Sequence, residues 1–119
     1  MADAQSFLPL NPREFLLLFV LVDGELHGYG LVKAVEEQTD GEIRMDPANL
    51  YRCIKRLERD ELVQQVGKRR AAQSNDERRR YYGITCLGKA VVKAEAERLD
   101  KLAAAARARK LISKRQRPA

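Results

Sequence analysis

Residues 46–60 read DPANLYRCIKRLERD, a stretch that combines a helix start, an apolar side and a basic side. Asp46 and Pro47 are typical of an N-cap and a first helical position, which predicts a helix to about Asp60. At 100° per residue, one arc of this helix holds Leu50, Cys53, Ile54 and Leu57, and the opposite arc holds Ala48, Arg52, Lys55 and Arg59. The helix is therefore predicted to pack on a core and to present basic side chains outward.

The chain before this stretch predicts two more helices. Asn11, Pro12 and Glu14 have the spacing of a capping box, and the apolar run of residues 15–22 follows them. Because that run is apolar nearly all round, its helix is expected to be covered on several sides, by its own domain and by a partner chain. Residues 28–38 predict the second helix, which a Thr-Asp-Gly turn closes.

The chain after residues 46–60 predicts a hairpin and a last helix. Residues 62–66 and 79–84 favour strands, and a basic, glycine-containing loop separates them. Thr85 is a suitable N-cap for a helix that reaches about Ile112. The apolar positions of this helix cover about half of its circumference by the 100° rule, which is wider than packing on one small domain requires. Part of this stripe is expected to contact another subunit.

Three helices, a two-stranded hairpin and a long helix, in a mainly α chain, make the order of a winged helix-turn-helix. In this fold the third helix enters the major groove of DNA and the hairpin contacts the backbone. Residues 9–85 are assigned to this DNA-binding domain and residues 86–112 to a C-terminal dimerisation helix. Residues 1–8 lack periodicity and are expected to form a flexible arm, and residues 113–119 a flexible basic tail.

The net charge of +6 is distributed unevenly. Residues 1–67 carry 7 basic and 12 acidic side chains, residues 68–80 carry 6 and 2, and residues 101–119 carry 7 and none. The positive charge thus lies in the hairpin loop and at the C-terminal end, a distribution that suits DNA or an anionic membrane surface. A run of charge is otherwise simply solvated surface.

Other classes of protein lack their usual signals in this sequence. The longest apolar run has eight residues, against the ~18 of a membrane span, and no basic region precedes it, so no membrane association and a cytoplasmic location are expected. Cys53, Cys86 and the single His27 are too few for a four-ligand zinc site, and no cofactor is expected. With one histidine and no phosphate-binding glycine motif, an enzyme is not expected either.

Contacts to DNA are expected from the basic side of residues 46–60. Arg52, Lys55 and Arg59 form one ridge, on which arginine can pair with guanine and either residue type can neutralise phosphate. Tyr51 on its flank can donate a hydrogen bond to phosphate, and Gly28 lets a phosphate approach the amides at a helix start. A basic ridge alone is more often solvated surface. Its occurrence together with the basic hairpin loop favours DNA binding.

Four pieces of the sequence resemble the PadR family of transcription regulators. They are residues 26–29 (LHGY), 46–52 (DPANLYR), 57–62 (LERDEL) and 79–85 (RRYYGIT), and the likeness covers roughly residues 12–100. The resemblance implies a dimeric winged-helix regulator, usually a repressor, of the short subfamily with one helix after the wing. It also implies that Tyr51, the residues that open the third helix and the arginines before Tyr81 face DNA.

The residue pattern and the resemblance together define two sets of site residues. The predicted DNA-binding residues are Gly28, Tyr29, Ala48, Asn49, Tyr51, Arg52, Lys55, Arg59, Arg69, Arg70, Arg78, Arg79 and Arg80. The predicted dimer interface consists of Phe15, Phe19, Leu87, Val91, Leu99 and Leu102.

The chain departs from the family pattern in three ways. Asn49 stands where Ser or Thr is common, so an amide would make the contact of a hydroxyl. Glu61 replaces the usual turn glycine, which predicts that this turn does not need a strongly positive φ. The chain has no Trp, which argues against the aromatic-sandwich drug pocket of some relatives.

Two alternatives stay open at this point. A winged-helix adaptor that binds another protein would show nucleic-acid binding that is insensitive to charge reversal on the third helix. Cys86, at a helix start, could be a redox-sensitive thiolate, whereas Cys53 falls on the apolar arc. The operator, the regulated genes and any small-molecule effector are not indicated by the residues.

Overall fold

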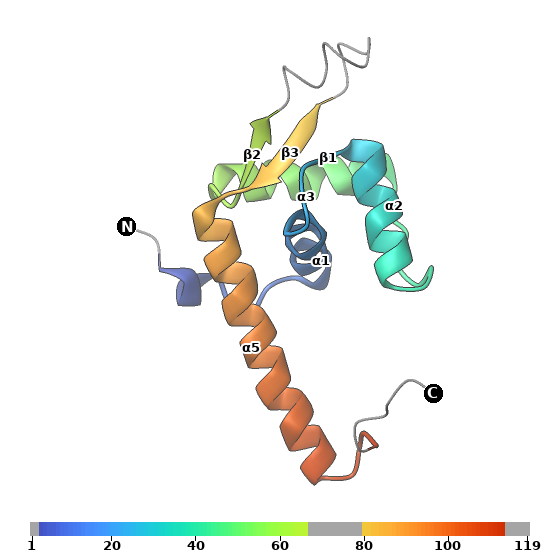
Figure 1. Ribbon diagram of the computed structural model, residues 1–119, viewed down its shortest axis with the longest axis vertical. Helices are drawn as coiled ribbons and strands as arrows, with labels where there is room; N and C mark the ends of the chain where they lie inside the picture. Colours follow the sequence, from blue (N-terminus) through green and yellow to red (C-terminus); the bar gives the residue numbers. More distant parts are fainter. Residues whose placement is uncertain (1–2, 67–79, 114–119) are drawn as a thin grey trace.

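The computed structural model describes residues 3–66 and 80–113, and its elements follow the predicted order (Figure 1). They are the 3₁₀ helix η1 (Ala4–Phe7), helix α1 (Pro12–Leu21), strand β1 (Leu26–His27), helix α2 (Gly28–Gln38), helix α3 (Pro47–Arg59), strands β2 (Val63–Val66) and β3 (Tyr81–Ile84), and helix α5 (Cys86–Ala108). The chain is mainly α with a small antiparallel sheet, as predicted. Across these two described ranges, none of the helices has the length and apolar character needed to cross a membrane.

The sheet has three strands rather than the two that the sequence predicts. Its order is β1-β3-β2, and both pairings with β3 are antiparallel. Val63 pairs with Ile84 in the hairpin, and Leu26 pairs with Tyr82 on the other edge of β3. Because β1 has only two residues, it carries no alternation that sequence reasoning could detect. This short strand fixes the start of α2 against the first two residues of β3.

Helix α1 lies at the centre of the core, against α2, α3 and α5 (Figure 1). Leu17 and Leu18 of α1 are completely buried, and so are Leu31 and Val35 of α2. Such burial stabilises by roughly 1.5–3 kcal/mol for each large aliphatic side chain. The apolar run of residues 15–22 is therefore explained largely by packing within its own chain, although part of it stays exposed.

Residues 3–10 pack against α5, whereas residues 1–8 were expected to form a flexible arm. Phe7 and Leu8 pack against the core, and the amide of Leu10 donates to Oε2 of Glu95 at 3.0 Å. Glu95 is buried, and Arg98 donates to both of its oxygens. The hydrogen bond from Arg98 lowers the pKa of the Glu95 carboxyl. The segment lacked helical periodicity because its contacts are made to α5, a distant part of the chain.

Glu14 does not complete the predicted capping box of α1. Asn11 accepts from the amide of Arg13 at 2.9 Å and caps the helix as expected. The carboxylate of Glu14 instead accepts from Nη1 of Arg56 on α3, at 2.7 Å. Glu14 is buried, so this pair joins α1 to the inner flank of α3.

The end of α3 corrects the prediction for Glu61, whose φ is +62°. The amide of Leu62 donates to the carbonyl of Leu57 at 2.9 Å, and the amide of Glu61 donates to that of Glu58 at 3.0 Å. These two bonds define a Schellman motif with Glu61 in the left-handed position. The tertiary packing of buried Leu62 imposes this conformation on a residue that disfavours it.

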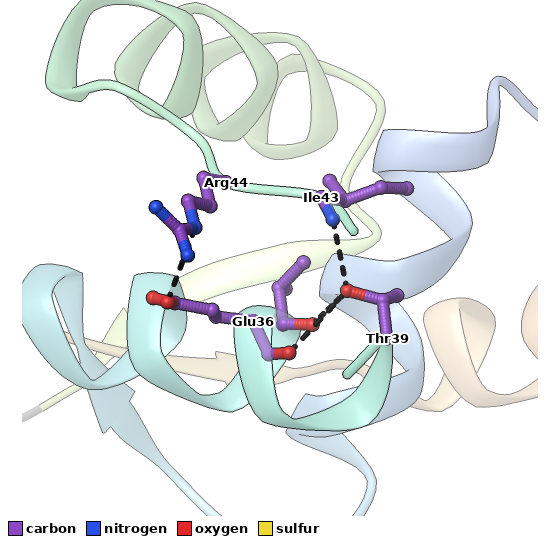
Figure 2. Close-up of polar contacts among 5 residues, drawn as sticks. Glu36, Thr39, Ile43 and Arg44 are labelled. Carbon is purple, nitrogen blue, oxygen red and sulfur yellow. Dashed lines mark hydrogen bonds and ion pairs between the residues drawn. The ribbon is translucent and has the colours of Figure 1, made fainter. Parts of the chain in front are cut away.

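The turn between α2 and α3 is held by the hydroxyl of Thr39 (Figure 2). This oxygen donates to the carbonyl of Val35 at 2.9 Å and accepts from the amide of Ile43 at 3.1 Å. Arg44 and Glu36 add an ion pair at 3.3 Å, and both of their side chains are considerably exposed. The hydroxyl thus sets the path of the chain from α2 into α3.

We expect Thr39→Val to lower the free energy of unfolding by about 1–2 kcal/mol, because the partly buried amide of Ile43 loses its acceptor. The two side chains have the same shape, so packing should be kept. Urea unfolding measures the change. Arg44→Ala is the matched control and should cost less than about 1 kcal/mol, since exposed ion pairs contribute little. Equal effects of the two variants would contradict a special role for the hydroxyl.

Candidate nucleic-acid interface

Helix α3 has the two sides that its sequence predicts. Leu50, Ile54 and Leu57 are buried, whereas Cys53 is only partly so. On the opposite side Ala48, Arg52, Lys55 and Arg59 are all exposed. Asp46 caps the helix by accepting from the amide of Asn49 at 2.8 Å. The basic ridge therefore faces solvent, and the opposite side of the helix is packed in the core.

Two exposed tyrosines stand beside this ridge, each with a lysine one turn further along its helix. The side chain of Tyr51 on α3 is half exposed, and Nζ of Lys55 lies 5.2 Å from its ring centroid. Tyr29 on α2 is more exposed, and Nζ of Lys33 lies 5.9 Å from its ring. Both ammonium groups are within cation–π range. The contact of Lys33 with Tyr29 was not predicted from the sequence, although the i,i+4 spacing of the two residues favours it.

His27 has a structural role at the start of α2. Its Nδ1 accepts from the amide of Gly30 at 3.2 Å, so His27 is the N-cap of α2. Its ring stacks on Tyr29 and meets Tyr81 edge-on, with centroids 6.4 Å and 5.3 Å apart. His27 thereby orients Tyr29 and ties the start of α2 to β3.

A hollow of about 730 Å³ lies between α2, α3 and β3. Its lining includes four of the predicted DNA-binding residues, namely Gly28, Tyr29, Tyr51 and Arg80. Gly28 and Tyr29 belong to α2 and Tyr51 belongs to α3, whereas the exposed Arg80 directly precedes β3. The fold therefore brings the start of α2, the flank of α3 and the start of β3 to one surface.

Four other predicted contacts, Arg69, Arg70, Arg78 and Arg79, lie outside the described residues. In the sequence they lie between β2 and β3. Arg80, which directly precedes β3, is the described member of this basic group.

The predicted dimer residues fall into two groups. Phe19, Leu99 and Leu102 are exposed by 39%, 40% and 55%, and Phe15, which is half-buried, stacks on Phe19 with centroids 5.8 Å apart. Val91 is completely buried in the core of its own chain, so its assignment to an interface is wrong. Leu87 is half-buried and packs against the same core. The available apolar surface of α5 therefore lies in its C-terminal half, away from the sheet (Figure 1).

The two cysteines are free thiols in different surroundings. Burial raises the pKa of the Cys53 thiol, and the nearby carboxylate of Glu14 adds to this effect. Both effects disfavour the thiolate form of Cys53. Cys86 is exposed at the first position of α5.

The fold and this surface define a class of protein. Helices α2 and α3 form a helix-turn-helix, and β2 and β3 form the wing that follows it, so the chain is a winged helix-turn-helix protein. Residues 17–94 match the Transcriptional regulator PadR-like family, and the chain belongs to this family. This family consists of transcription regulators rather than enzymes, and the match supports the DNA-binding transcription regulation that the sequence predicts.

Known proteins resemble the chain in sequence and in fold. An uncharacterised 37.1 kDa protein in transposon Tn4556 of Streptomyces fradiae is 33% identical over 92 residues, or 77% of this chain; the chain spans only 24% of that protein. A PadR-like transcriptional regulator from Bacillus cereus superposes with a TM-score of 0.68 at 18% identity, covering 85% of this chain and 92% of that one. A transcriptional regulator from Clostridium thermocellum gives 0.67 at 21% identity, covering 92% and 93%. At these identities the two structures establish the fold alone.

Proposed function

We propose that this protein is a sequence-specific repressor that binds an inverted repeat in duplex DNA as a homodimer, in the cytoplasm. Helix α3 enters the major groove, and the wing contacts the phosphate backbone. Repression is supported by the resemblance to PadR regulators. In this arrangement occupancy of the operator blocks transcription, and no bound cofactor is needed.

The observation that carries the proposal is the two-sided packing of α3. Arg52, Lys55 and Arg59 are exposed along a helix whose opposite side is fixed in the core by Leu50 and its neighbours. A rigid helix with exposed guanidinium and ammonium groups can present donors to the edges of bases, where guanine offers two acceptors. Tyr29, Tyr51 and Arg80 extend the same surface with groups suited to phosphate.

Selection of bound sequences from a random duplex pool tests the proposal. The expected result is enrichment of an inverted repeat whose half-sites are separated by about one helical turn. Transcription from a promoter carrying that repeat should then fall when the protein is added. A pool without enrichment, combined with binding that charge reversal on α3 does not change, would indicate an adaptor that binds another protein.

We expect Arg52→Ala to cost about 1–3 kcal/mol on the selected site and little on random duplex, because a base contact is lost while most phosphate contacts remain. The residue is exposed, so the free energy of unfolding should barely change. Tyr51→Phe is the comparison, since loss of a phosphate hydrogen bond should weaken both kinds of site by similar amounts. Titrations of both duplexes with each variant give the ratio. If Arg52→Ala weakens both duplexes equally, Arg52 does not read a base.

Neutralising Arg69, Arg70 and Arg78 together should weaken binding to all duplexes alike. The expected reason is the loss of sequence-independent phosphate contacts, each of which contributes about 0.9 to the slope of log affinity against log salt. Affinities measured between low and physiological salt give that slope. A slope equal to that of the unmodified protein would mean that the wing does not touch the backbone.

A further inference from the structure

We propose that Asn49 is a positioning residue, which holds the guanidinium of Arg52 ready to read a base rather than reading one itself. The inference rests on the proposed function, because it concerns how α3 distinguishes one DNA sequence from another. The proposed role of Asn49 and Asp46 is to orient Arg52, and this role does not follow from the fold or from the position of Asn49 on the helix.

The first step is the pair of hydrogen bonds between Asp46 and Asn49. One carboxylate oxygen of Asp46 accepts from the backbone amide of Asn49 at 2.8 Å, and the other accepts from its side-chain Nδ2 at 2.9 Å. A single carboxylate at the start of α3 therefore binds the same residue at two points. The side chain of Asn49 cannot rotate without breaking one of these bonds.

The second step is the bond from Arg52. Its Nη1 donates to Oδ1 of Asn49 at 3.0 Å. A carboxylate can only accept and a guanidinium can only donate, so the amide nitrogen must face Asp46 and the amide oxygen must face Arg52. The opposite orientation would place two acceptors together on one side and two donors on the other. The chemistry of the neighbours thus fixes the direction of the amide.

The third step concerns the N–H donors of Arg52 that are not bonded to Asn49. A guanidinium has five N–H donors, and the bond to Asn49 uses one of them. The remaining donors are sufficient for bidentate pairing with O6 and N7 of guanine. Because an arginine side chain loses much rotamer freedom when it is immobilised, holding it in advance lowers the entropic cost of the base contact. The effect is confined to sites that Arg52 recognises.

A double-mutant cycle on the selected site and on random duplex tests the inference. Asn49→Ala should lower the ratio of specific to random affinity by about 3- to 10-fold, the factor expected from ordering one long side chain. In the Arg52→Ala background the same change should have no further effect on the ratio. Equal effects in both backgrounds would overturn the proposal, because Asn49 would then contact a base directly. No effect in either background would overturn it as well.

Lys55→Ala is the matched control, since Lys55 lies on the same exposed side but outside this chain of bonds. Its effect should add to that of Asn49→Ala. Asn49→Ala keeps the backbone amide that Asp46 caps, so the helix start should stay intact, and thermal unfolding checks this.

A measurement on the free protein separates failure of this inference from failure of the proposed function. The heteronuclear NOE of the Arg52 Nε–H group should be higher than that of exposed Arg59 and should fall to the Arg59 value in Asn49→Ala. If the pool selection enriches no sequence, the proposed function fails whatever this NOE is. If Arg52 is as mobile as Arg59 in the unmodified protein, the positioning role fails even when a specific site is found.

Discussion

Gly88→Ala is expected to lower the free energy of unfolding by about 3 kcal/mol, a large share of the total for a small domain. Gly88 is buried in the first turn of α5, where a Cβ would lie 2.2 Å from the carbonyl oxygen of Leu62 and 2.7 Å from Cγ1 of Ile84. That carbonyl accepts from the amide of Thr85 at 3.0 Å, so it cannot move away without breaking a bond at the helix start. The gain of about 1 kcal/mol in helix propensity is too small to offset the clash.

Gly30→Ala in the first turn of α2 is the control for this prediction. A Cβ at this position would lie 3.4 Å from Cδ2 of Leu26, a contact that the end of a leucine side chain can accommodate. The bond from its amide to His27 would be kept, so stability should stay equal or rise by up to about 1 kcal/mol. Urea unfolding of both variants gives the comparison. If Gly88→Ala is as stable as Gly30→Ala, the close approach of α5 to Leu62 is not a constraint on the sequence.

Replacing Leu99 and Leu102 together by Glu is expected to convert the proposed homodimer into monomers. These two side chains are 40% and 55% exposed on the C-terminal half of α5, so they are free to pack on another subunit. Burial of each leucine contributes about 1.5–3 kcal/mol, and the charges would also have to be desolvated, so the dimer dissociation constant should rise by more than about 100-fold. Sedimentation equilibrium at micromolar concentration measures the change.

Lys101→Glu is the matched control, because it changes charge on the same helix while pointing away from Leu99 and Leu102. It should leave the dimer intact. Since the leucines are exposed in the single chain, the double variant should keep its helical circular dichroism. A monomeric unmodified protein at micromolar concentration would refute dimerisation through this surface.

The helix ends show where local reasoning succeeds and where it fails. The N-caps Asn11, Asp46 and Thr85 were all predicted, because an N-cap side chain bonds to amides within three residues of itself. The left-handed residues after the helices were not: Glu61 and Lys110 both have φ above +60°. Neither is glycine, so the sequence carries no sign of a conformation that packing and backbone bonds impose.

The candidate site likewise has features that the sequence predicts and features that it does not. The exposure of Arg52, Lys55 and Arg59 follows from helical periodicity and needed no structure. The hollow shared by Tyr29, Tyr51 and Arg80 could not be predicted, because it depends on how α2, α3 and β3 approach one another.

The sequence by itself determined the type and order of the main elements and the two sides of α3. These features depend on periodicity, capping residues and turn residues, which act over a few positions of the chain. Only the tertiary structure decided that Val91 belongs to the core, that Glu14 pairs with Arg56, and that η1 and β1 form at all. Each of these depends on contact between residues far apart in the chain, and one sequence carries no record of which distant side chains meet. Whether an apolar residue is buried depends on the packing of its neighbours. For this reason part of the wide apolar stripe of α5, including Val91, belongs to the core and not to a surface for a partner.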